Sequence, residues 1–184
     1  MLHNGYIKLD TLIRKGNKKD KEQMEEIKSR YSTRESFISE LAFAMSDHDI
    51  QEEQYLNLTQ QDLSVILRED YSWGKKWPAE GDEVILVDKT PSWEAFQQME
   101  EFADSIANSR ITKELYHALE KRHPFSAFRY AAESTGVIQQ WYQWRDHWQN
   151  EQAEEWMHEN GVDFKDGKIV ADGKHTFVWS WKDE

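Results

Sequence analysis

Apolar residues recur every three or four positions over most of the second half of the chain, which is the spacing of helices that bury one face. Four helices are predicted there, over about residues 91–106, from Ser109 or Thr112, from Pro124, and over about residues 137–160. Thr90 and Pro91 fit the N-cap and first position of the first of these helices, and Gly161 fits the end of the last. The pattern predicts a C-terminal bundle of about four helices.

An earlier helix is predicted from the capping-box pattern of Ser32 and Glu35, in which each side chain can hydrogen-bond the other residue's backbone. The apolar residues that follow keep mostly helical spacing up to Ser46 and are expected to face a core. They are Phe37, Ile38, Leu41, Phe43, Ala44 and Met45.

Short apolar and β-branched runs lie between this helix and the predicted bundle, and such runs are typical of strands. Residues 55–58 and 63–67 predict a hairpin around a turn at residues 59–62. Residues 83–87 predict a third strand.

A second hairpin is predicted after the bundle, from residues 164–170 and 174–181 around a turn at residues 171–173. The predicted fold class is therefore α+β: a small antiparallel sheet, an N-terminal helix, a C-terminal bundle of about four helices and a terminal hairpin. We expect residues 1–162 to form a single α+β domain and residues 163–184 to form a hairpin extension.

The composition changes this picture in one respect, because it excludes several kinds of chemistry. The 184 residues hold 23 Lys and Arg against 35 Asp and Glu, a net charge of -12, which argues against a uniformly basic nucleic-acid binder. The nine Trp, seven Tyr and eight Phe favour a folded chain despite a mean hydropathy of -0.92. The absence of Cys excludes disulfides, Cys-ligated zinc and thiol nucleophiles.

The acidic charge is concentrated in the middle of the chain. Residues 35–120 carry a net charge of -13, residues 121–184 carry -3, and residues 1–34 carry +4. The basic start is typical of a solvated segment, and contact with an anionic polymer is the alternative. No secretory signal precedes it, and the longest apolar run, residues 84–87, is far too short to span a membrane. We expect a cytoplasmic protein with no membrane partner.

Two pairs of His and Glu residues on the predicted long helix are candidate metal ligands. His147 and Glu151 are four residues apart, and Glu154 and His158 repeat that spacing. Such pairs can present ligands to a divalent metal, although solvated ion pairs explain the same spacing. A metal-dependent enzyme is therefore one alternative. The sequence holds no Gly-rich phosphate loop and no nucleophile elbow, so no reaction and no cofactor are assigned.

Arginine and aromatic residues gather on the last two predicted helices. The candidate binding residues are Arg122, Arg129, Arg145 and Tyr142. Exposed rings could stack on bases while arginines meet phosphates. Alternatively, the rings form a Trp-rich core with arginines at its rim. Acidic neighbours such as Glu133 and Asp146 disfavour nucleic acid.

Three stretches of the chain carry motifs of a known family. The first stretch is Q-Y-L-N-L-T at residues 54–59. The second is L-Y-H-A-L-E at residues 115–120, followed by F-S-A-F-R at residues 125–129. The third is Q-W-Y-Q-W-R at residues 140–145, followed by E-W-M at residues 155–157. In order and spacing they resemble the Y-L-D-L-E-T-G, L-x-x-A-[IL]-x-G-x-G-A-F-R-R-F-K, W-Y-x-F-R and E-W-L motifs of the uncharacterised bacterial protein family numbered 0158. The resemblance implies a fold pattern and no activity.

The chain departs from this family between the second and third motifs. Lys121, Arg122 and His123 stand where the family has G-x-G, and residues 124–128 read P-F-S-A-F where it has A-F-R-R-F. An anion-binding role for this segment would rest on Arg122 and Arg129. The aromatic positions that match the family are expected in the core; they are Phe125, Phe128, Trp141, Tyr142 and Trp156.

These observations favour a non-enzymatic cytoplasmic module that binds a protein partner or regulates one. Weak nucleic-acid or anion binding through the arginine and aromatic residues is the first alternative, which the net charge disfavours. The metal-dependent enzyme is the second. The sequence leaves the oligomeric state open.

Overall fold

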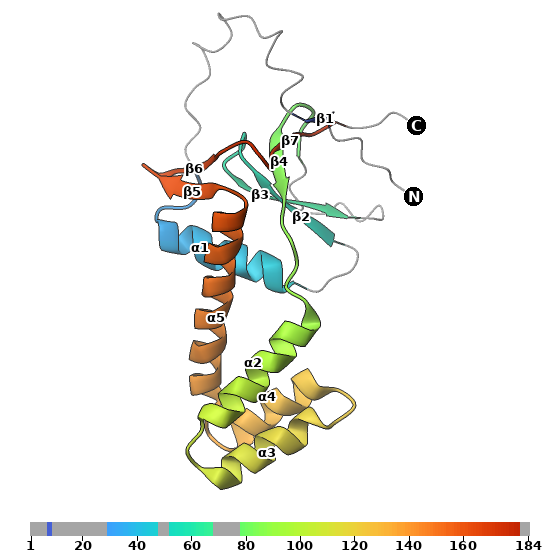
Figure 1. Cartoon of the computed structure of the whole chain (residues 1–184), viewed down its shortest axis with the longest axis vertical. Helices are drawn as coiled ribbons and strands as arrows, with labels where there is room; N and C mark the ends of the chain where they lie inside the picture. The colour runs from blue at the N-terminus through green and yellow to red at the C-terminus, as the bar shows by residue number, and fades with distance from the viewer. Residues whose placement is uncertain (1–6, 9–28, 48–51, 68–77, 181–184) are drawn as a thin grey trace, which may run out of the picture. The chain divides into compact units, whose positions relative to one another are not determined.

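The computed structural model describes residues 7–8, 29–47, 52–67 and 78–180, and confirms the α+β class (Figure 1). The chain divides into two compact units. Unit 1 is formed by residues 1–89 and 153–184, and unit 2 by residues 90–152. Unit 1 contains the strands, whereas unit 2 is helical in its described elements. The domain boundary predicted at residue 162 stays a prediction.

Unit 1 is built on a five-stranded antiparallel sheet in the order β1-β7-β4-β2-β3. Its strands are β1 (Ile7–Lys8), β7 (Phe177–Val178), β4 (Glu83–Leu86), β2 (Glu52–Asn57) and β3 (Asp62–Leu67). The predicted hairpin is confirmed, because β2 pairs with β3 along its whole length. The third predicted strand is also confirmed as β4, which pairs with β2.

A separate two-stranded sheet follows, formed by β5 (Val162–Lys165) and β6 (Lys168–Ala171). Its turn consists of Asp166 and Gly167, both at positive φ, 53° and 75°. These two dihedrals are typical of a type I′ turn, which Asp-Gly favours. The predicted turn at residues 171–173 is therefore wrong. The chain contains a second Asp-Gly pair there, and the sequence pattern alone does not distinguish the two.

Helix α1 (Arg34–Ser46) precedes the sheet and begins one residue later than the predicted capping box implies. Thr33 is the N-cap: its Oγ1 accepts a hydrogen bond from the Ser36 N–H at 3.1 Å, and the Thr33 N–H donates to the Ser36 Oγ at 3.2 Å. The predicted box of Ser32 and Glu35 is wrong because Thr33 and Ser36 have the same spacing and form the box instead.

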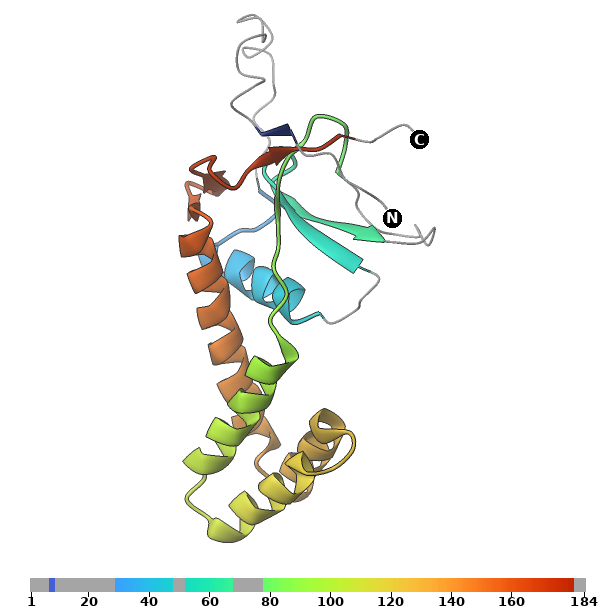
Figure 2. The same ribbon diagram turned by 45° about the vertical axis from the view of Figure 1, so that its right-hand side comes forward.

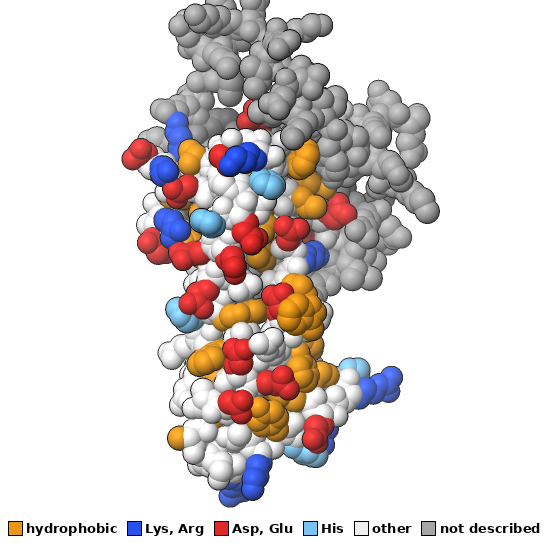
Figure 3. All heavy atoms as spheres, in the orientation of Figure 1, with side chains coloured by type: hydrophobic (Ala, Val, Ile, Leu, Met, Phe, Trp, Pro, Cys, Tyr) orange, Lys and Arg blue, Asp and Glu red, His pale blue; other side chains and the backbone are white. Residues whose placement is uncertain are grey.

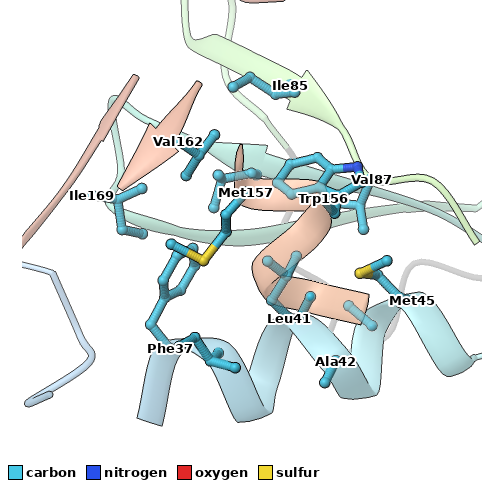
Figure 4. Packing of buried hydrophobic residues seen from close by; sticks show 14 of the residues in the cluster. Phe37, Leu41, Ala42, Met45, Ile85, Val87, Trp156, Met157, Val162 and Ile169 are labelled. Carbon is cyan, nitrogen blue, oxygen red and sulfur yellow. The ribbon is translucent and has the colours of Figure 1, made fainter. Parts of the chain in front are cut away.

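The main core of unit 1 lies between α1, the sheet and the last turns of α5 (Ile138–Glu159), as Figure 4 shows. Side chains from α1, β4, α5 and the β5–β6 hairpin point toward one another; among them are Phe37, Leu41, Met45, Ile85, Trp156, Met157, Val162 and Ile169. Phe43 is an exception to the predicted core face and is 71% exposed. It lies two positions from Leu41, about 200° around the helix, and so faces away from the core.

The opposite face of the five-stranded sheet carries a second, smaller cluster. Tyr55, Val84 and Trp179 are buried there, and the rings of Tyr55 and Trp179 meet edge to face with centroids 5.2 Å apart. Since Leu56 and Ile85 are buried on the α1 side, β2 and β4 are covered on both faces. This explains why each strand has two consecutive buried apolar residues, Tyr55 and Leu56 in β2 and Val84 and Ile85 in β4, rather than an alternation with polar ones.

Unit 2 consists of α2 (Ser92–Ser105), α3 (Ser109–Leu119), α4 (Pro124–Ser134) and the part of α5 up to Gln152 (Figure 2). The predicted bundle of about four helices is confirmed, and α4 starts at Pro124 as expected. Its core contains Met99, Phe102, Ala103, Leu115, Leu119, Phe128, Ala132, Val137 and Trp141.

Two details of α2 differ from the sequence prediction. Pro91 is the N-cap, without a side-chain hydrogen bond, so the predicted cap at Thr90 is wrong by one residue. Trp93 lies at helical spacing from the apolar residues that follow it, a pattern that predicts burial, yet it is 65% exposed, because the first turn of α2 precedes the buried positions, which begin at Met99. Among the helices of the described part, none combines the length and apolar character needed to cross a membrane.

Candidate functional site

The four predicted binding residues belong to unit 2, and the structure separates them into two pairs. On α5, the guanidinium of Arg145 lies 5.0 Å from the centroid of the Tyr142 ring. Arg145 also donates from Nε and Nη2 to Asp146 Oδ1, at 3.0 and 2.6 Å. The charge of Arg145 is therefore balanced locally by a ring face and a carboxylate.

Arg122 and Arg129 are different, because both are exposed and neither hydrogen-bonds or ion-pairs with any residue that the structure describes. Arg122 immediately precedes His123, the N-cap of α4, and Arg129 lies in the middle of that helix. Within the described residues, no hydrogen bond or cation–π contact joins either arginine to Arg145 or Tyr142. The structure thus leaves two free guanidinium groups on or beside α4.

Two aromatic side chains accompany these arginines. Phe125 is 47% exposed and Tyr130 is 73% exposed. Phe125 and Arg129 are four residues apart and therefore share a face of α4. We call Arg122, Phe125, Arg129 and Tyr130 the α4 surface. The prediction that Phe125 is a core residue is wrong, since Phe128 and Ala132 supply the buried face of this helix.

The tryptophans of α5 do not form an open stacking platform. Trp141 is buried, with its ring centroid 5.3 Å from Phe102 and 5.1 Å from Phe128. Trp144 contacts the same Phe102 ring, and its Nε1–H donates to Gln98 Oε1 at 3.2 Å. These two tryptophan rings pack against residues of α2 and α4. This is the arrangement that the alternative of a Trp-rich core predicts.

The four predicted metal ligands all lie on α5. In unit 2, His147 Nε2 is 3.3 Å from Glu151 Oε1, with both side chains exposed. In unit 1, Glu154 Oε1 pairs with Arg34 Nη1 at 2.6 Å, and His158 is exposed. Within the described ranges, no group of three or more His, Cys, Asp or Glu residues could hold a metal ion. The metal hypothesis stays a prediction that these geometries do not favour.

A network of buried polar residues in unit 1 was missed by the sequence analysis. Asp82 Oδ2 accepts hydrogen bonds from Asn57 Nδ2 at 2.7 Å, from the Ala79 N–H at 2.8 Å and from Gln60 Nε2. Asp82 and Asn57 are both buried. The available sequence signal was a polar Asn57 between the apolar residues Leu56 and Leu58. With this oxygen saturated, the network supports the β2–β3 turn rather than a reaction.

A second buried carboxylate stands at the other end of the same turn. Asp62 Oδ1 accepts from the Tyr31 hydroxyl at 3.0 Å and from the Leu63 N–H at 2.8 Å, and lies 3.2 Å from Arg30 Nε. Burial and the neighbouring Asp62 charge raise the pKa of the Tyr31 phenol well above its ordinary value. Because the Tyr31 phenol stays protonated, it acts as a hydrogen-bond donor to Asp62. We therefore interpret the cluster of Tyr31, Asp62 and Arg30 as structural.

Comparison of the sequence with known proteins tests the family resemblance described above. UPF0158 protein PA5073 of Pseudomonas aeruginosa is 27% identical to the chain over 128 residues, which are 68% of this chain and 82% of the relative. The similarity supports membership of the UPF0158 family. No family model matches the chain, and no solved structure matches it. The resemblance inferred from the motifs is confirmed, and the UPF0158 name assigns no activity.

Proposed function

We propose that the chain is a non-enzymatic cytoplasmic module that binds a protein partner through the α4 surface. The observation that carries the proposal is the exposure of Phe125 and Tyr130 on the helix of two arginines that have no partner among the residues the structure describes. Aromatic and arginine side chains are enriched at protein interfaces, where they account for much of the binding free energy. The two buried carboxylates of unit 1 are already engaged by the residues around them, which favours a binding role over catalysis.

The exposed aromatic residues permit a matched experiment. The affinity-tagged full chain and the F125S/Y130S variant are crosslinked in lysate of the source organism, and the captured proteins are compared. The control variant, F43S/W93S, also removes two aromatic side chains that are 71% and 65% exposed, but leaves the α4 surface intact. We expect one reproducible partner with the unchanged chain and with the control, and its loss with F125S/Y130S.

Two results contradict the proposal. One is the same set of partners for all three proteins. The other is no reproducible partner together with turnover in a broad hydrolase panel.

Nucleic-acid binding is a second candidate, which the free Arg122 and Arg129 favour and the pairing of Arg145 weakens. A gel shift at about 50 mM salt tests it, because phosphate contacts are strongest at low salt. The net charge of -12 leads us to expect no shift.

A further inference from the structure

The arginines of the described residues fall into two groups. Four are paired with carboxylates: Arg30 with Glu40, Arg34 with Glu154, Arg110 with Glu114 and Arg145 with Asp146. Arg122 and Arg129 are the two that are not. In a chain with 35 acidic residues against 23 basic ones, neighbouring carboxylates are abundant. Two arginines left unpaired beside one helix therefore mark a surface that can accept an external anion.

The local charge around α4 is opposite to that of the chain. Residues 110–130 contain five Lys and Arg and two Asp and Glu, a net charge of +3, which Glu133 near the end of α4 lowers to +2, whereas the chain carries -12. Figure 3 shows Lys and Arg side chains over the region of α3 and α4. We call residues 110–130 the basic segment. Since charge complementarity fixes the register of a partner and excludes others, this segment selects for an acidic one.

The basic segment is bounded within unit 2. Helix α2 carries Glu94, Glu100, Glu101 and Asp104 and no Lys or Arg. A protein that binds single-stranded nucleic acid typically contacts about 4–16 nucleotides, each of which carries a negatively charged phosphate. Such a polymer would extend beyond the two free arginines toward repelling carboxylates. A short peptide with a few acidic residues can remain within the basic segment.

The exposed aromatic residues add a second requirement. Phe125 lies on the same face of α4 as Arg129, and Tyr130 lies about 100° further around the exposed side of the helix than Arg129. Burying these rings needs apolar atoms or ring faces from the partner. Bases could stack on them, but only as part of a strand that carries a phosphate at every nucleotide, whereas a peptide supplies apolar side chains with few charges. We infer that the partner of the α4 surface is an acidic peptide segment that carries at least one aliphatic or aromatic side chain. This inference rests on the proposed function.

The test uses the intact chain and a random library of 12-residue peptides displayed on phage. We expect the enriched peptides to contain several Asp or Glu residues around one or more apolar residues. Affinities of the best peptide are then measured by fluorescence anisotropy for two charge variants. R122E/R129E and K165E/K174E each lower the net charge by four, but only the first alters the α4 surface, since Lys165 and Lys174 are exposed residues of unit 1.

We expect R122E/R129E to weaken binding at least about tenfold and the control to change it less than about twofold. Enrichment of basic or uncharged peptides, no enrichment at all, or equal effects of the two variants would overturn the inference. Tighter binding of a 20-nucleotide single strand, lost in R122E/R129E, would overturn it in favour of nucleic acid. If uncharged peptides bind and F125S/Y130S abolishes their binding, the proposed function stands and the acidic partner does not.

Discussion

The side-chain amide of Gln61 pairs with the backbone of Ile169 in the way that a neighbouring strand would. Its Nε2 donates to the Ile169 carbonyl at 2.9 Å, and the Ile169 N–H donates to Oε1 at 2.6 Å. Gln61 lies in the β2–β3 turn at φ 56°, and Ile169 is a buried residue of β6. One glutamine therefore connects the five-stranded sheet to the β5–β6 hairpin and satisfies two buried backbone groups.

Replacing Gln61 with Ala should lower the free energy of unfolding by about 2–4 kcal/mol, because the Ile169 N–H and carbonyl lose their partner. Urea unfolding at pH 7 measures this loss. The control is Gln61→Gly, which removes the same bonds but relieves the positive φ, and should be about 1 kcal/mol more stable than Gln61→Ala. A Gln61→Ala protein as stable as the unchanged chain would show that the pair contributes nothing.

Tyr31 should make stability fall at alkaline pH. The pKa of its phenol is raised in the folded chain, first by burial and then by Asp62. Above about pH 10, where a free phenol ionises, the unfolded chain releases a proton that the folded chain retains, so the contribution is complete below pH 10 and is lost above it. Urea midpoints between pH 8 and pH 11 should therefore decline more steeply for the unchanged chain than for Tyr31→Phe.

At neutral pH, Tyr31→Phe should cost about 1.5–3 kcal/mol, because the buried Asp62 loses the hydroxyl that donates to it. Parallel pH profiles for the two proteins would contradict the raised pKa, whatever the size of the difference at pH 7.

Two structural features require glycine at position 161. It ends α5 at φ 62°, and a Cβ there would overlap the carboxylate of Asp172. Gly161→Ala should destabilise unit 1 by about 2–3 kcal/mol, from the positive φ and the overlap together. Gly173→Ala is the control within the same unit: its φ is 82° but its Cβ position is open, so only about 1 kcal/mol should be lost. Equal losses in thermal unfolding would mean that Asp172 moves aside freely.

Phe125 and Phe128 allow binding and folding roles to be compared on one helix. Phe128→Ala removes a fully buried ring that contacts Trp141 and should cost about 3–5 kcal/mol. Phe125→Ala should cost less than about 1 kcal/mol, because half of its ring is already in water. Urea unfolding followed by Trp fluorescence distinguishes them. A loss of several kcal/mol of unfolding free energy for Phe125→Ala would show that Phe125 is a core residue, and would contradict its place in the proposed α4 surface.

The helices and most of the strands could be predicted from periodicity, whereas strand β1, the pairing of β7 with β1 and β4, and the ends of the elements could not. Caps and turns depend on single residues, and the chain offers alternatives one or a few positions apart. Ser32 and Thr33 can each cap α1, and two Asp-Gly pairs can each form the last hairpin turn. Which of them is used depends on packing. Gly161, for example, accepts a hydrogen bond from the Asp172 N–H, which keeps the second pair outside the turn.

The candidate site could be predicted in part. Arg122 and Arg129 were identified from the sequence, but their difference from Arg145 depends on Asp146 and Tyr142 in three dimensions. Phe125 was assigned to the core because aromatic residues at helical spacing usually lie there. The position of the buried face, and thus the exposure of Phe125 and Tyr130, follows only from the packing of α4 on Phe102 and Trp141.

The strand order has a consequence for synthesis of the chain. Strand β7 lies between β1 and β4 in the sheet, yet it follows the whole of unit 2 in sequence. On the ribosome, β1 and β4 are made early and must wait for a partner until α2, α3, α4 and α5 have emerged. Unit 2 is contiguous and rich in local contacts, so it can fold first, while the exposed edge of β4 remains open to wrong pairing. The step most prone to aggregation is therefore completion of the sheet, and slowing translation after α5 would prolong it.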